Sequence, residues 1–318
     1  MNSTKKLTEA ALLSSLFIVC TIAAVASGFG YALYLDFIVP VFFCLICIKC
    51  ELKYTLLSGI SSLLIVGLVL GNLGTAVWAT QSVILGIMCG VLLSKSTSIM
   101  DDLVYGSVFG VLLMILIDVY ASALIGYSFM KEFQEYAQVF PNKNFADIIY
   151  YLFIATFPFG MVFSIYYISL IIAKRLKILS GNSKKKYEIM SKFKLYSRFV
   201  CCSKKVFYLC SGYILLVEII KILNTSIDLV YLKTVIICVE YLCMYFVIRD
   251  GFVSIQNYII SKYKKISYAR IISLISLISL IIMFKITIGI IVICNIVLEK
   301  KINIRVVQNQ LIDSLIKQ

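Results

Sequence analysis

The chain has 318 residues, of which 61% are hydrophobic and only 14% are charged, and it carries a formal net charge of +14. A soluble domain is about 45–50% apolar and about 25% charged, so this composition excludes a cytosolic enzyme, a secreted disulfide scaffold and a disordered protein. The apolar residues occur in continuous runs, which disfavours a transmembrane β-barrel. The sequence therefore predicts an all-α fold, a polytopic transmembrane helical bundle.

The hydrophobic runs divide the chain into about 8–10 predicted membrane spans. The first run follows a short basic start and continues beyond the core of a signal peptide, so we interpret it as a retained helix. The last run, residues 271–297, is too long for one untilted pass, and Lys285, Thr287 and Gly289 interrupt it, which leaves one pass or two open. The other spans are expected at residues 7–25, 37–48, 54–70, 75–93, 103–129, 148–173 and 206–223, and from near 229 to between 248 and 260.

Positive charge is concentrated in alternate segments between these spans. Most of the 30 Lys and Arg residues lie at the N-terminus, in residues 174–205, in residues 249–270 and in the tail, whereas the long loop 130–147 has only Lys131 and Lys143. The positive-inside rule then predicts a cytoplasmic N-terminus and C-terminus, and the resulting even number of passes favours two passes in the last run. The predicted domains are a six-helix membrane domain (1–173), a basic cytoplasmic linker (174–205) and a C-terminal transmembrane helical module (206–318).

Residue types that commonly carry catalysis or bind metals are absent or poorly placed. Histidine is absent, and neither a P-loop nor a Gly-x-Ser-x-Gly motif occurs, so we expect no enzyme, no cofactor and no ATPase within this chain. Cys44, Cys47 and Cys50 have an iron–sulfur spacing but no fourth ligand follows, so no metal is expected. The positive net charge is explained by basic residues that collect on cytoplasmic loops, so it does not indicate nucleic-acid binding. The expected partner is the lipid bilayer.

Small residues recur at four-residue spacing in several predicted spans. Because they lack bulky side chains, two helix backbones can approach closely, and packing within the bundle is the expected role. In the first span, Ala10, Ala11, Ser14 and Ser15 form a stripe that either packs internally or receives a helix of another membrane protein. The Gly-x-x-x-Gly motifs are Gly67 to Gly71, Gly86 to Gly90 and Gly106 to Gly110.

Polar residues within or beside the spans are candidate ligand-binding groups, because their burial in lipid is costly. Gln81, close to the single tryptophan Trp78, and Asp118 lie within predicted spans, and Asp36 and Asn72 are expected near the outer surface. A pocket open to the outside and lined by aromatic and a few polar groups suits a small ligand. The alternative is an aromatic belt at the level of the lipid headgroups.

Other intramembrane charges leave further interpretations open. Glu218 and Lys221 lie one helical turn apart and are expected to pair, as are the neighbours Arg249 and Asp250 at the inner rim. An intramembrane enzyme that uses Asp118, Glu218 or Glu240 remains an alternative.

The opening residues 5–19, Lys-Lys-Leu-Thr-Glu-Ala-Ala-Leu-Leu-Ser-Ser-Leu-Phe-Ile-Val, resemble the first helix of the substrate-binding S-components of energy-coupling factor (ECF) vitamin transporters. The whole chain is similar to the YybS-like family of bacterial membrane proteins, in which an S-component-like front half precedes further helices. The chain departs from that family at Asp250, where Gln is usual, and at Asn295, where Asp is common. The matching late patterns are Gly251 through Lys262, Lys264 and Lys265, and Ile271 through Lys300, Lys301 and Arg305.

This resemblance implies a protein of the bacterial plasma membrane with six front helices that bind a vitamin or metal ion from outside. It implies that Ala10, Ala11, Ser14 and Ser15 contact a transporter coupling subunit, and that a separate ATPase supplies any energy. The alternative hypothesis is a structural or regulatory membrane protein whose basic segment, with Lys184, Lys185 and Lys186, recruits a soluble partner or lipid.

Overall fold

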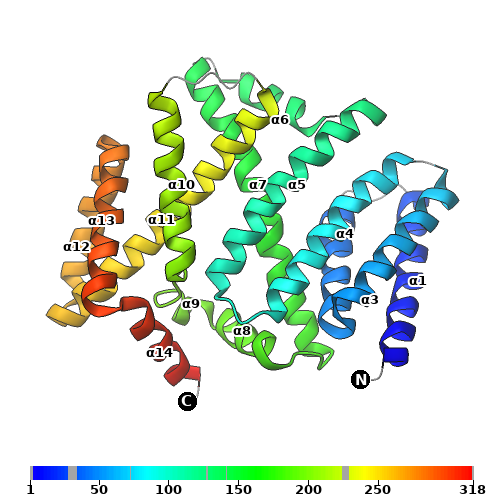
Figure 1. Cartoon of the computed structure of the whole chain (residues 1–318), viewed down its shortest axis with the longest axis horizontal. Coiled ribbons are helices and arrows are strands. Elements are labelled where there is room, and N and C mark those ends of the chain that lie inside the picture. The colour runs from blue at the N-terminus through cyan, green and yellow to red at the C-terminus, as the bar shows by residue number, and fades with distance from the viewer. Residues whose placement is uncertain are drawn as a thin grey trace. The chain divides into compact units, whose positions relative to one another are not determined.

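Figure 1 shows the computed structural model of the chain, in which every described element is helical. The all-α fold is therefore confirmed. By length and apolar composition, five described helices can cross a membrane. Five is fewer than the roughly 8–10 spans predicted from the sequence. The difference arises because several apolar stretches fold as helices that are shorter, interrupted or more highly charged. The structure describes residues 3–27, 34–71, 73–126, 128–140, 142–223 and 229–316.

The chain divides into two compact units. Unit 1 comprises residues 1–97 and 105–187, and unit 2 comprises residues 98–104 and 188–318. The division after residue 187 falls inside the predicted basic linker. The elements that begin before this division are α1 (Ser3–Ser27), the π-helix η1 (Tyr34–Ile38), α3 (Val39–Leu70), α4 (Leu73–Ser94), α5 (Ile99–Ile125), α6 (Phe129–Gln138), α7 (Lys143–Arg175) and α8 (Gly181–Ser191). The elements that follow are α9 (Phe193–Tyr196), α10 (Lys204–Ile222), α11 (Val230–Tyr263), α12 (Ile266–Ile282), α13 (Phe284–Ile302) and α14 (Ile304–Ile316).

In unit 1, α1, α3 and α4 lie side by side around a shared apolar core (Figure 1). Phe17 of α1 and Phe43 of α3 are both buried, and their rings meet edge to face with centroids 5.0 Å apart. Val83 of α4 completes this core. Such close packing of apolar side chains supplies the dispersion contacts that join helices when lipid offers no hydrophobic driving force.

Helix α3 is interrupted at Glu51, whose φ of 72° and ψ of 161° are not helical. This interruption falls between the second and third predicted spans, so two apolar segments follow one another within α3. The Glu51 carboxylate forms an ion pair with Lys6 of α1, and Lys49 lies 3.2 Å from Glu9 of α1. These ion pairs hold the first turns of α1 against the interruption.

Two of the glycine motifs allow close helix contacts inside unit 1. A Cβ atom added at Gly86 of α4 would overlap the backbone of Pro40 in α3, and one at Gly106 of α5 would lie 2.7 Å from Val162 of α7. The predicted role of these motifs in internal packing is confirmed. Gly71 differs, because it ends α3 in the left-handed conformation with a φ of 60°.

Unit 2 is built on α11, which packs against α10, α12 and α13. The last apolar run folds as two helices, α12 and α13, which lie side by side (Figure 1) and meet at the non-helical residue Met283. Gly251 of α11 admits Ile291 of α13, because an added Cβ there would overlap the isoleucine side chain. The structure thus favours the divided form of this run, with the break just before Lys285.

Candidate functional site

Asp118, a predicted ligand group, holds the start of α6 in unit 1. The side chain is fully buried, and its two carboxylate oxygens accept hydrogen bonds from the Ser128 hydroxyl at 2.8 Å and the Phe129 backbone N–H at 2.7 Å. Ser128 also caps α6 by accepting from the Lys131 N–H. A carboxylate at a helix N-terminus is stabilised by the helix dipole. Asp118 therefore positions α6.

Trp78 joins the same region through an aromatic chain. Its ring lies 4.6 Å from that of Phe129 in an edge-on arrangement, and Phe129 stacks on Phe133 at 6.5 Å. Phe133 in turn contacts Phe157 of α7, with centroids 5.9 Å apart. The first turn of α6 thus brings the predicted residues Trp78 and Asp118 together, since Phe129 touches both.

The remaining predicted ligand groups lie elsewhere in unit 1 or outside the described part. Gln81 is buried on α4, one turn beyond Trp78. Asp36 is half-buried in η1, where desolvation raises the pKa of its carboxyl to about 6. Asn72 lies outside the described residues.

A groove of about 370 Å³ lies beside this aromatic chain, between η1, α6 and α7. We call it the aromatic groove. Its volume falls within the usual range for small-molecule sites, about 300–1,000 Å³. Phe37 follows Asp36 directly, so the half-buried carboxyl is adjacent in sequence to one wall. The lining residues are Phe37, Phe133, Phe153, Thr156, Phe157, Gly160, Met161 and Ser164.

The small-residue stripe of the first helix lines a second groove, of about 420 Å³, between α1 and α3. Ala10 and Ser14 face α3, where the Ser14 hydroxyl lies 3.3 Å from that of Ser62. Ala11 and Ser15 are exposed on the open side. One side of the stripe therefore packs internally, and contact of its open side with another membrane protein stays a prediction.

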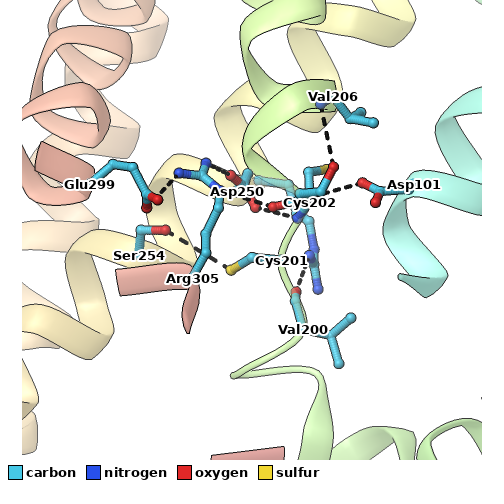
Figure 2. A network of polar contacts seen from close by, with 11 residues as sticks. Asp101, Val200, Cys201, Cys202, Val206, Asp250, Ser254, Glu299 and Arg305 are labelled. Carbon is cyan, nitrogen blue, oxygen red and sulfur yellow. Dashed lines mark hydrogen bonds and ion pairs between the residues drawn. The ribbon is translucent and has the colours of Figure 1, made fainter. Parts of the chain in front are cut away.

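Unit 2 contains a buried ionic network around Arg305 (Figure 2). The sequence patterns place Arg305 among the basic residues of the tail and do not predict this network. One guanidinium nitrogen of Arg305 lies 2.6 Å from Asp250, another lies 3.1 Å from Glu299, and Nε donates to the Cys202 carbonyl at 2.9 Å. The ring of Phe207 packs 4.6 Å from the guanidinium carbon. Burial alone lowers the pKa of Arg305, but the paired carboxylates raise it overall, so the side chain stays charged.

The same network fixes the segment that precedes α10. Asp250 accepts the Cys202 N–H at 2.8 Å, and Asp101 accepts the Ser203 N–H at the same distance (Figure 2). Burial first, and then the charge of Asp250, raises the pKa of the Cys201 and Cys202 thiols well above the ordinary value, so both thiols stay protonated.

The expected pair between Arg249 and Asp250 is wrong. Neighbouring residues in a helix point in different directions, and here Arg249 donates to the Val200 and Ser197 carbonyls while Asp250 turns to Arg305. No short-range pattern predicts the real partner, because it lies 55 residues away.

The expected pair of Glu218 and Lys221 is confirmed, at 3.4 Å, but it belongs to a larger cluster. Lys221 also lies 2.7 Å from the fully buried Glu240 of α11, and Lys285 of α13 lies 2.8 Å from Glu218. Two carboxylates and two ammonium groups balance one another and link α10, α11 and α13.

These observations define the chain as a polytopic α-helical membrane protein. The profile of a family described as "Predicted membrane protein (DUF2232)" matches residues 13–143, which include every predicted ligand group. No curated protein and no solved structure matches the chain. The match lies within the front half and agrees with a multi-pass membrane protein.

Proposed function

We propose that the front half binds a small, mainly apolar molecule in the aromatic groove and takes part in its transport, in the manner of an ECF S-component. The observation that carries this proposal is the groove of about 370 Å³, which is lined by the four phenylalanines Phe37, Phe133, Phe153 and Phe157. Aromatic walls offer large contact area and edge-on or stacked geometry to a flat ligand. Thr156 and Ser164 supply polar groups within the wall.

The small-residue groove between α1 and α3 supports a partner for this function. We assign it to a helix of a transporter coupling subunit, because the small exposed residues Ala11 and Ser15 let another helix approach closely. In this proposal the chain has no catalytic chemistry or ATPase activity, and it lies in the plasma membrane with its N-terminus in the cytoplasm. Ser15→Leu should abolish co-purification with such a subunit, whereas the exposed, non-lining change Val19→Leu should not.

Native mass spectrometry of the full-length protein from its own membranes tests the ligand proposal. The wild-type protein should carry a small molecule that the double variant Phe133→Ala/Phe157→Ala loses. Phe145→Ala is the matched control, because Phe145 is exposed at the start of α7 and does not line the groove. Equal retention by the double variant and the control, or no adduct on any of them, contradicts the proposal.

The alternative function, recruitment of a soluble partner or lipid by the basic segment, is supported by the exposed Lys184 and Lys185 of α8. Lys186 is different, because it is buried and its ammonium group donates to the Leu92 carbonyl at 2.6 Å. Lys184→Gln/Lys185→Gln should therefore abolish recruitment without affecting insertion. Unchanged recruitment contradicts this alternative.

A further inference from the structure

A third groove, in unit 2, is formed by segments that are far apart in the sequence. It lies between residues 198–199, the end of α11 and the corner between α13 and α14, and its volume is about 440 Å³. Apolar side chains, including Phe199, Ile302 and Leu311, form most of its wall. We call it the tail groove. It is independent of the aromatic groove and of the function proposed above.

The cations of the tail groove are exposed, and no Asp or Glu is among its described lining residues. Arg198 and Lys262 are both solvent-accessible. The ammonium group of Lys262 lies 5.8 Å from the ring centroid of Tyr258, an arrangement that stabilises the cation without neutralising it. The Asn257 amide donates to the Arg198 carbonyl at 2.6 Å and so holds this backbone beside α11. The groove therefore favours an anionic group.

Gln308 of α14 gives the groove a polar interior. Its side chain lines the groove and is only 3% exposed, yet neither its amide nitrogen nor its amide oxygen has a hydrogen-bond partner among the described residues. A buried amide without partners is unfavourable, and native proteins satisfy such groups with water or a ligand. Gln308 therefore favours an occupant that offers hydrogen-bonding groups to its amide.

The wall that carries Gln308 is held in place before any ligand binds. Arg305, one turn earlier in α14, forms the buried ion pairs with Asp250 of α11 and Glu299 of α13. The exposed apolar residues Val307 and Leu311 continue along the same helix. A preformed site loses less entropy on binding than one that must be ordered.

We propose that the tail groove binds an anionic phospholipid. Its phosphate lies between Arg198 and Lys262, its glycerol–ester region meets the Gln308 amide, and one acyl chain follows the apolar wall. Charge complementarity selects the anionic headgroup, and the mainly apolar wall selects a lipid rather than a free phosphate. The three segments also belong to stretches predicted on the cytoplasmic side, where anionic lipids are abundant.

Native mass spectrometry of the full-length protein in a neutral detergent tests this proposal. Phosphatidylglycerol and phosphatidylcholine with identical acyl chains are titrated as probes, with glycerol 3-phosphate as the headgroup alone. Arg198→Gln/Lys262→Gln should bind phosphatidylglycerol about 30-fold more weakly, since each cation near an anionic lipid contributes about fivefold. The control Lys264→Gln/Lys265→Gln removes the same charge outside the groove and should bind as the wild type does.

Two further variants keep the test independent of charge. Val307→Trp fills the groove while both cations remain, and it should abolish phosphatidylglycerol binding. Gln308→Leu should weaken binding about tenfold but raise the melting temperature of the lipid-free protein, because it removes the unpartnered amide. The proposal is overturned if the charge variant matches its control, if phosphatidylcholine or glycerol 3-phosphate binds as tightly as phosphatidylglycerol, or if Val307→Trp binds normally.

Discussion

Arg305 and Asp250 lie 55 residues apart in the sequence and form a buried ion pair with 2.6 Å between guanidinium nitrogen and carboxylate oxygen. Asp250 is fully buried, and Arg305 also pairs with Glu299 across the corner between α13 and α14. The backbone N–H of Cys202 satisfies the second carboxylate oxygen. Removing these charged groups from water costs free energy. Because each buried charge is stable only beside its partner, the network favours one arrangement of the helices that carry it.

Removal of Arg305 should destabilise unit 2. Arg305→Met leaves two buried carboxylates without their cation, and breaking a buried pair in this way costs about 3–5 kcal/mol. The measurement is the free energy of unfolding by chemical denaturation in detergent micelles. Arg270→Met is the control, because Arg270 is exposed. Equal stability of the two variants would show that the ion pair contributes nothing.

Asp118→Ala should release the start of α6. The variant removes both acceptors for Ser128 and Phe129, and loss of a helix cap costs about 0.5–2 kcal/mol. Because Phe129 packs on Trp78, the single tryptophan, the emission of Trp78 should shift to longer wavelength as the ring becomes hydrated. Ser122→Ala, a half-buried change on the same helix whose hydroxyl donates to the Val119 carbonyl, should leave the emission unchanged. An unshifted spectrum of Asp118→Ala contradicts the capping role.

Gly86→Ala and Gly160→Ala should have opposite effects on stability. An added Cβ at Gly86 collides with the Pro40 backbone, and such overpacking typically costs about 1–3 kcal/mol. Nothing lies within 4 Å of a Cβ at Gly160, so alanine there should stabilise α7 by about 0.5–1 kcal/mol. Thermal melting in detergent measures both changes. A stable Gly86→Ala protein would exclude the close approach of α3 and α4.

The Asp36 carboxyl should make stability fall as the pH rises. Its pKa is raised from 3.8 to about 6 by burial, so the folded protein holds this proton more tightly than the unfolded chain does. The stabilisation is complete below about pH 4 and is lost as the pH rises through about 6. Melting temperatures measured from pH 4 to pH 7 should fall more for the wild type than for Asp36→Asn. Parallel curves would mean that the pKa of Asp36 is not raised.

The predicted orientation can be tested with single cysteine substitutions. Lys131→Cys on α6 should react in intact cells with a maleimide that does not cross the membrane, and Lys184→Cys on α8 should react only after the cells are opened. Both positions are exposed, so access to solvent on the correct side decides the outcome. The native Cys201 and Cys202 are poor competitors, since their raised pKa keeps them as thiols. Labelling of Lys184→Cys in intact cells would contradict the predicted cytoplasmic location of α8 and of the N-terminus.

Local patterns predicted those features that depend on neighbours along one helix. The Gly86 and Gly106 motifs predicted close packing, and the Glu218 and Lys221 spacing predicted a contact that exists. The partner of Asp250 was predicted incorrectly, because adjacency along the chain does not bring side chains together on a helix. Asp118 drew attention as a polar residue in an apolar span, but its role in holding α6 depends on a turn that the pattern does not specify.

The sequence by itself determined that this chain is an all-helical membrane protein, because only helices satisfy the backbone of long apolar runs within lipid. Tertiary structure alone decided that Arg305 pairs with Asp250 and Glu299, and that Arg198, Lys262 and Gln308 line the same groove. The physical reason is distance along the chain. Hydrophobicity acts on each helix separately, whereas ion pairs and grooves form only after several helices have packed together.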